Sequence, residues 1–260
     1  MTQGVDRETR VRRNWIKGAL YALTGRGRCP LCRGHARPVA ASWMHSHLRC
    51  RRCGLIFVAD LPPLSNLYDA YRVVHLSEYQ VRHKRDWGPW IQFKDLTLDR
   101  VGLPRWERDG AGRALDLGCG EGRLLQVLRG RGWQATGLEL NPVLAGEARR
   151  LGFEVVAGGV EHAALGGPFE LITAFHLLEH LRSPTAALDR TRSWLRPGGV
   201  LVVETPLRPD FDNIDHLYCF SAASLELALV SGGFTPRSWF DYIDANYGHH
   251  NLVCLAEARA

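Results

Sequence analysis

The stretch "ALDLGCGEG", residues 114–122, joins an apolar run to a glycine-rich turn. Asp116 lies near the end of the apolar run, and Gly118 and Gly120 follow it. Glycines between a strand and a helix let a ligand approach the bare backbone closely. The spacing departs from the G-x-G-x-x-G pattern of dinucleotide folds, because Arg123 stands where that pattern has its third glycine. The turn therefore predicts a ligand site but not the ligand.

Two carboxylates indicate which ligand the turn would hold. Asp116 would repel a pyrophosphate, whereas it would attract a ligand that carries an ammonium and a sulfonium group. Glu139 ends the next strand-like segment, where a carboxylate can accept both hydroxyls of a ribose. Together they predict S-adenosylmethionine as the cofactor.

Strand-like and helix-like segments alternate from Gly112 to the carboxyl end of the sequence. This alternation predicts an α/β fold with a doubly wound, mostly parallel sheet, helices on both faces, and ligands at the carboxyl ends of the strands. The segments expected as strands are "RALDLG", "WQATGLEL", "FEVVAG", "FELITAFH", "GVLVVETP", "RSWFDYI" and "NLVCLAEA".

Four cysteines form two C-x-x-C pairs, Cys29 with Cys32 and Cys50 with Cys53, separated by seventeen residues. Four thiolates at this spacing can form the tetrahedral site that Zn²⁺ prefers, and four sulfurs close the coordination shell. The pairs predict a structural zinc ion in a small ribbon-like fold. His45 and His47 lie between the pairs and are alternative ligands.

The other three cysteines, Cys119, Cys219 and Cys254, occur singly. We also expect no secretory leader, because Lys17 interrupts the apolar stretch near the start and no small-residue cleavage site follows. A reducing, cytoplasmic location is therefore expected, and disulfide pairing of the C-x-x-C cysteines is the less favoured alternative.

The 260 residues suffice for one large domain and a smaller attachment, and no apolar run of eighteen residues predicts a membrane span. Residues 1–28 carry a net charge of +5 out of the total of +6. Apolar residues follow helical spacing in this arm: Trp15, Ile16, Ala19, Leu20 and Leu23. We expect a helix that docks on its own protein or frays, with contact to a membrane surface or RNA as the alternative.

Four ordered segments resemble the class I S-adenosylmethionine-dependent methyltransferases: "LDLGCGEG", "LEL" followed by "NP", "FELITAFHLLEHL" and "WLRPGGVLVVETP". The resemblance covers residues 110–258. It implies a Rossmann-like sheet of seven strands, the last antiparallel to the rest, and a methyltransferase activity.

The resemblance also implies which residues bind the cofactor. Asp116 and the turn residues Gly118, Cys119 and Gly120 would line its methionine and ribose side, with Glu139 and Leu140 at the ribose. Phe175 would border the methyl donor. Family members often have an acidic residue near the adenine, where this sequence offers backbone groups of Gly159 and Val160 or the nearby Glu161.

Candidate catalytic residues follow the fourth strand-like segment in "HLLEH", which contains His176, Glu179 and His180. His180 is a candidate general base or a structural histidine, and His216 is a second candidate. The letters also match an inverted zinc-protease motif, but the strand-to-helix context is wrong for it. Related quinone-pathway O-methyltransferases hold a divalent metal with E-x-x-E-H here, where this sequence has His176 first.

The cysteine pairs and a tyrosine-rich segment resemble a subset of these enzymes from sugar and natural-product pathways. The predicted organisation is a basic arm (1–27), a zinc-ribbon-like domain (28–60), an aromatic-rich helical connector (61–108) and a methyltransferase domain (109–260). The connector aromatics would either cover an acceptor pocket or pack between domains. They are Tyr68, Tyr71, Tyr79, Trp87, Trp90 and Phe93.

The predicted function is methyl transfer to a small-molecule hydroxyl or carbon, on a sugar, a sugar nucleotide or a natural product. A zinc-ribbon RNA methyltransferase is the first alternative, although the near-neutral charge of the catalytic part counts against nucleic acid. A non-catalytic binding module with a vestigial cofactor fold is the second. A second copy of the chain is a further candidate partner.

Overall fold

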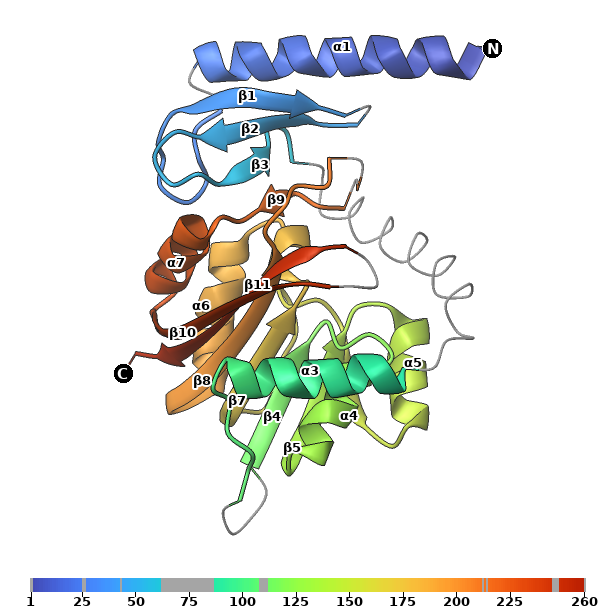
Figure 1. Cartoon of the computed structure of the whole chain (residues 1–260), viewed down its shortest axis with the longest axis vertical. Helices are drawn as coiled ribbons and strands as arrows, with labels where there is room; N and C mark the ends of the chain where they lie inside the picture. Colours follow the sequence, from blue (N-terminus) through green and yellow to red (C-terminus); the bar gives the residue numbers. More distant parts are fainter. Residues whose placement is uncertain are drawn as a thin grey trace.

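The computed structural model describes residues 2–24, 27–42, 44–61, 87–107, 112–211, 213, 215–244 and 248–259. They form a seven-stranded sheet below a smaller four-stranded sheet, and the helix α1 (Thr2–Leu23) lies across the smaller sheet (Figure 1). Among the described residues, no helix combines the length and the apolar character that crossing a bilayer requires.

The large sheet has the order β10-β11-β8-β7-β4-β5-β6. Strand β11 pairs antiparallel with both of its neighbours, and the other pairings are parallel. The predicted seven-stranded, mostly parallel sheet is thus confirmed. Its strands are β4 (Gly112–Leu117), β5 (Trp133–Glu139), β6 (Glu154–Ala157), β7 (Phe169–Phe175), β8 (Leu195–Pro206), β10 (Phe234–Ile243) and β11 (His250–Ala258).

Helices cover both faces of this sheet, because neighbouring strand residues point to opposite sides. Ala114 of β4 packs with α3 and α4, whereas the next residue, Leu115, belongs to the core that includes α6 and α7. Ser183 caps α6 by accepting a hydrogen bond from the Ala186 backbone. The helices are α3 (Gly88–Arg100), α4 (Arg123–Gly130), α5 (Pro142–Arg150), the short η1 (Leu178–His180), α6 (Pro184–Trp194) and α7 (Ala222–Ser231).

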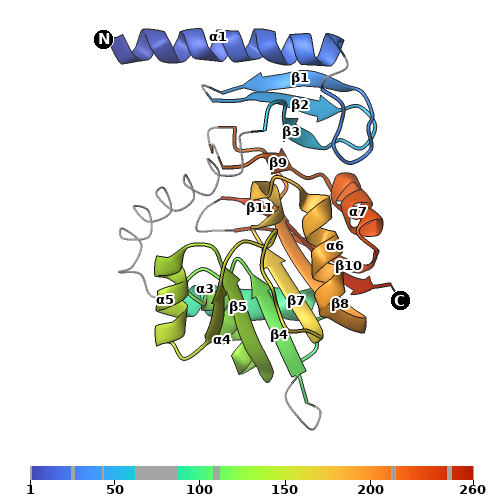
Figure 2. The same cartoon turned by 180° about the vertical axis from the view of Figure 1, so that it is seen from behind.

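The small sheet contains β1 (Ala36–Ala41), β2 (Ser46–Cys50) and β3 (Ile56–Val58) of the cysteine-rich segment. Its fourth strand, β9 (Tyr218–Cys219), comes from the region between β8 and α7 and pairs antiparallel with β3. The small sheet is therefore joined to the large one through β9, and Figure 2 shows this junction from behind. The proposed domain boundaries do not anticipate this shared strand.

The basic arm forms a helix, but it docks on the small sheet through its polar and glycine-containing face and not through its apolar residues. Gly18 is buried and lies close to Ser46, and the Asn14 side chain donates to the Ser42 carbonyl oxygen at 3.1 Å. The apolar residues Trp15, Ile16, Leu20 and Leu23 are exposed. Within the predicted connector, α3 confirms a helix, whereas Tyr68, Tyr71 and Tyr79 lie outside the described residues.

Candidate active site

The glycine turn at the end of β4 is held against β5 by its own backbone. Gly118 and Cys119 both donate to the Leu138 carbonyl oxygen, at 2.8 and 3.1 Å. The φ angles of Gly118 and Gly120 are +71° and +54°, in the left-handed region that favours glycine. A side chain at Gly118 would also approach Leu177 to 3.3 Å. Gly118 is thus kept bare for steric as well as conformational reasons, and Gly120 for conformational reasons.

Glu139 connects this turn to the start of α5. Its carboxylate accepts from the Gly120 backbone at 2.9 Å and from the Asn141 backbone at 2.7 Å, and its side chain is almost fully buried. Asn141 in turn caps α5 by accepting from the Val143 backbone at 2.9 Å. These bonds fix the Glu139 carboxylate at the carboxyl edge of β5.

Two hollows of about 770 and 1010 Å³ adjoin the turn and share the residues Gly118 and His176. The first is lined by residues that include the predicted ribose and adenine set, namely Glu139, Leu140, Gly159 and Val160, together with His180. The second is lined by residues that include the predicted methionine-side set, namely Asp116, Cys119, Gly120 and Phe175, together with Trp90 and Lys94.

Asp116 is buried at the floor of the second hollow. Its Oδ1 accepts a hydrogen bond from the Thr173 hydroxyl at 2.7 Å. Burial raises the pKa of Asp116 to about 7, with a smaller contribution from the nearby charge of Glu139. A positively charged ligand group beside it would therefore replace missing solvation and favour the carboxylate form.

A buried group of charged side chains beside the second hollow was not predicted from the sequence. Oε1 of Glu204, at the end of β8, accepts from Lys94 Nζ at 2.5 Å, His176 Nε2 at 2.8 Å and the Tyr242 hydroxyl at 2.9 Å. Lys94 and Glu204 are almost completely buried. Burial would raise the pKa of Glu204, but the charge of Lys94 and the bond from His176 hold it at about 2.

His176 stands where the two hollows meet and has a strained backbone, with φ at +49°. Its ring lies between Glu204 and Glu179, with Nδ1 at 3.3 Å from Glu179 Oε1. Burial would lower the pKa of His176, but the bonds to Glu179 and Glu204 outweigh it and raise the pKa to about 9. At neutral pH His176 is therefore a cationic donor and not a base.

A family model described as a methyltransferase domain matches residues 82–252, about two thirds of the chain. The chain belongs to this family. The match covers α3 together with the β4–β11 region. It therefore includes both hollows and the charged group around Glu204.

Curated relatives of this methyltransferase are named ubiquinone biosynthesis O-methyltransferases. The protein from Xylella fastidiosa is 35% identical over 162 residues, which is 55% of this chain and 64% of that protein. The protein from Marinobacter nauticus is 29% identical over 147 residues, which is 50% of this chain and 60% of that protein. The matches thus span between about half and two thirds of the length of these relatives.

Solved structures share the fold of this methyltransferase. One is a 1,6-didemethyltoxoflavin-N1-methyltransferase from Burkholderia thailandensis with bound 1,6-didemethyltoxoflavin and S-adenosylhomocysteine. It has a TM-score of 0.61 at 19% identity, and the match covers 86% of this chain and 99% of that protein. A magnesium protoporphyrin IX methyltransferase from Synechocystis with bound S-adenosylhomocysteine has a TM-score of 0.59 at 13% identity. The match covers 75% of this chain and 100% of that protein.

Three of the predicted catalytic residues lie close together, and one of them, His180, lines the first hollow of the methyltransferase. Ligand atoms of Glu179, His180 and His216 all lie within 4.8 Å of one another, a set that could hold a divalent ion. His180 Nδ1 lies 2.9 Å from the Asp215 carbonyl oxygen, and its ring contacts that of His216. Burial, assisted by the charge of His180, lowers the pKa of His216 to about 4 and keeps that ring neutral.

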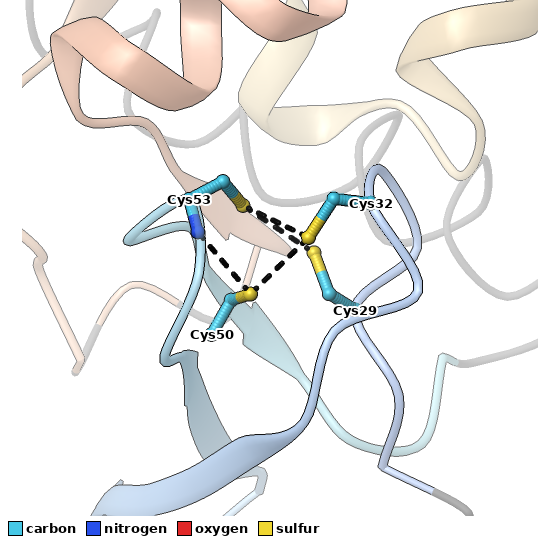
Figure 3. A group of neighbouring side chains, drawn as sticks. All are labelled: Cys29, Cys32, Cys50 and Cys53. Carbon is cyan, nitrogen blue, oxygen red and sulfur yellow. Dashed lines mark hydrogen bonds between the residues drawn. The ribbon is translucent and has the colours of Figure 1, made fainter.

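The four cysteines of the ribbon lie together, with their sulfur atoms pointing toward one another (Figure 3). The Sγ distances are 3.6 Å from Cys29 to Cys53, 3.4 Å from Cys32 to Cys50 and 3.7 Å from Cys32 to Cys53. A tetrahedral zinc ion with bonds of about 2.3 Å would place its sulfurs roughly 3.8 Å apart. The residues present therefore fit Zn²⁺, and His45 and His47 are not part of this described group.

Proposed function

We propose that this chain transfers a methyl group from S-adenosylmethionine to a hydroxyl of a small-molecule acceptor. The observation that carries the proposal is the meeting of two hollows at Gly118 and His176, with Glu139 in one and Asp116 in the other. The first has the residues for an adenosine group, and the second has the buried carboxylate that suits an amino acid cation.

The names of the curated relatives support oxygen as the methylated atom. The second hollow adds support for a small acceptor with an apolar ring, because Trp90 and Phe175 contribute to its lining.

When bound, S-adenosylmethionine would supply an electrophilic methyl group. Glu139 would bind the ribose hydroxyls, and Asp116 would hold the amino group of the methionine part. His176, as an imidazolium held between Glu204 and Glu179, would place a positive charge at the junction of the two hollows, near the acceptor oxygen. Methyl transfer depends mainly on such alignment, at about 3 to 3.5 Å between the reacting atoms.

His180 is the proposed general base for the acceptor hydroxyl. With Nδ1 donating to the Asp215 carbonyl oxygen, Nε2 would be the nitrogen that accepts the proton. General-base assistance of this kind is worth roughly 10² to 10⁴ in rate. The neutral His216 packs edge-on against the His180 ring, at 4.9 Å between ring centroids, and would fix its orientation.

We also propose a structural Zn²⁺ at Cys29, Cys32, Cys50 and Cys53. All seven cysteines of the chain lie in the described ranges and are free thiols. Two backbone groups, from Arg52 and Cys53, point at the Cys50 sulfur at 3.3 and 3.5 Å and would stabilise its thiolate form. The ion would hold the ribbon together and has no part in the proposed chemistry.

Calorimetry with S-adenosylhomocysteine tests the cofactor site, and turnover with phenolic and sugar hydroxyl acceptors tests the reaction. We expect binding in the wild type, weaker binding in Asp116→Asn, and methyl transfer that falls about 10²-fold or more in His180→Gln with binding unchanged. His35→Gln, at an exposed histidine of the ribbon, is the matched control. Full activity of His180→Gln on the true acceptor would refute the assignment of the base.

The same measurements separate the alternatives. A vestigial cofactor fold would give no heat of binding. An RNA methyltransferase would bind RNA with an affinity that falls steeply as salt rises, because each phosphate contact releases counterions. Acceptor binding that is insensitive to salt would support the small-molecule assignment.

A further inference from the structure

The outer face of α1 carries a compact group of exposed apolar side chains. Trp15 is 48% exposed, Ile16 61%, Leu20 55% and Leu23 84%. They supply four of the eleven large apolar side chains that are exposed among the described residues, and they lie within nine positions of one helix. Positions three, four and eight residues apart share one face of a helix, so these side chains form one surface. We call these four residues the outer apolar face.

The other side of α1 is occupied by contacts with the small sheet. Asn14 bonds to Ser42, Ser46 donates to the Asn14 carbonyl oxygen, and Lys17 pairs with Asp60. Both views show α1 at one end of the molecule, with the small sheet on one side of it (Figures 1 and 2). Docking on the ribbon therefore does not cover the outer apolar face.

The charge of the chain is concentrated around this face. Residues 1–61 hold twelve Lys and Arg but three Asp and Glu, a net charge of +9, whereas residues 62–260 have a net charge of −3. On α1 itself the exposed Arg12 and Arg13 stand one turn before Trp15 and Ile16. The outer apolar face is thus bordered by cations, while the methyltransferase part has the opposite net charge.

We propose that α1 docks on the surface of an anionic lipid bilayer. A helix with Trp, Ile and Leu on its outer side and Arg beside them matches the composition of helices that lie in the plane of a membrane interface. Its 22 residues would lie along the surface for roughly 33 Å. The apolar side chains would enter the headgroup region, and the arginines would remain at the level of the lipid phosphates.

Two other occupants fit the observations less well. A second copy of the chain would bring together two segments of net charge +9 across a small apolar contact, which is electrostatically unfavourable. RNA would satisfy the arginines but would leave Ile16, Leu20 and Leu23 against a polar phosphate backbone. A lipid surface satisfies both the charge and the apolar side chains.

Flotation of the full zinc-loaded chain with lipid vesicles tests the proposal. We expect binding to vesicles of phosphatidylcholine mixed with phosphatidylglycerol and much weaker binding to phosphatidylcholine alone. The variant Ile16→Gln, Leu20→Gln, Leu23→Gln should bind the mixed vesicles at least about a hundredfold more weakly, since each buried apolar side chain is worth roughly tenfold or more. Glutamine is used because it keeps helix propensity.

Two further variants complete the experiment. Arg12→Gln with Arg13→Gln should reduce binding to the mixed vesicles by about twentyfold, at roughly fivefold for each cation near the surface. The matched control, Leu96→Gln with Ile243→Gln, changes side chains that are 59% and 61% exposed outside the ribbon and should bind like the wild type. Unchanged binding of S-adenosylhomocysteine checks that the variants fold and separates this test from the proposed activity.

Several outcomes would overturn the proposal. One is a wild type that does not float with the mixed vesicles, and another is a triple variant that floats equally well. Light scattering that shows a dimer in the wild type and a monomer in the triple variant would assign the outer apolar face to a second copy. Tight RNA binding without vesicle binding would show that the basic residues around α1 bind nucleic acid instead of lipid.

Discussion

The ribbon and the cofactor cleft are both built around short turns, but different forces hold their functional groups. In the ribbon, four identical side chains from two local pairs converge, and the proposed Zn²⁺ would hold their sulfurs together. In the cleft, backbone groups of one turn meet the carboxylate of Glu139, while Lys94, Glu204 and Tyr242 come from positions up to 148 residues apart. If the zinc proposal is correct, the ribbon depends on a bound ion, whereas the cleft depends on the packed fold.

Removal of the proposed zinc ion should produce the largest difference between the two regions. A structural zinc site contributes about 10–16 kcal/mol of apparent folding free energy, so a chelator should unfold the ribbon. Amides of β1 and β2 should then lose protection from hydrogen exchange, whereas those of β4 and β5 should keep it. Zinc content should be measured before and after chelation as a control. Added Zn²⁺, but not Mg²⁺, should restore the zinc content and the protection of the ribbon amides.

The loss of zinc should also affect the acceptor side of the cleft more than the cofactor side. Strand β9 follows His216 by two residues, and the backbone of Leu217 donates to the Glu179 carbonyl oxygen at 2.8 Å. We expect turnover to fall while S-adenosylhomocysteine still binds. Equal loss of turnover and of S-adenosylhomocysteine binding would contradict the view that the cleft is held by its own packing.

The second prediction concerns the ion pair of Lys94 in the cleft. Lys94→Met leaves the buried Glu204 without its ammonium partner, which should lower the free energy of unfolding by about 3–5 kcal/mol. The matched control is Lys17→Met, which breaks the exposed pair with Asp60 and should cost about 1 kcal/mol or less. Chemical denaturation measures both. Similar losses of unfolding free energy in the two variants would show that the contribution of an ion pair to stability does not depend on its burial.

The third prediction uses the titration of Asp116. Its pKa is raised by burial to about 7, and the ionised form is the one that would attract the cationic ligand. Affinity for S-adenosylhomocysteine should therefore fall as the pH is lowered below about 7, by up to about tenfold per unit. Asp116→Asn should bind weakly at every pH. A wild-type affinity that does not change between pH values above and below 7 would remove Asp116 from the binding site.

The same contrast explains what the sequence could predict. The cysteine pairs, the glycine turn and the strand that ends in Glu139 are local patterns, and the structure brings their residues together as expected. The alternating segments also predicted the large sheet. Lys94 and Tyr242 could not be found in this way, because a lysine in a helix and a tyrosine in a strand show no periodic signal of burial.

Two features of the arm and the ribbon show a further limit of prediction from the sequence. Strand β9 joins the small sheet through a pairing of Tyr218 with Phe57, which no local pattern announces. The arm was correctly expected to be helical, but its apolar residues did not identify the docking face. A buried Gly18 allows the close approach of helix and sheet, and such a contact depends on the shape of both surfaces.

The fourth and smallest prediction concerns His176 at the junction of the two hollows. Its pKa is raised from 6.5 to about 9, because bonds to Glu179 and Glu204 outweigh the effect of burial. A raised pKa contributes stability that is complete below pH 6.5 and is lost as the pH rises through about 9. The side chain is 37% exposed, so solvent screening should limit the change to about 1 kcal/mol or less.

Chemical denaturation at several pH values, with wild type and His176→Gln side by side, measures this contribution. The difference in unfolding free energy between the two proteins should shrink between pH 6.5 and about 9, because glutamine does not titrate. If His176→Gln has the same pH dependence as the wild type, the pKa of His176 is not raised in the folded protein, and the proposed positive charge at the junction would have to be abandoned.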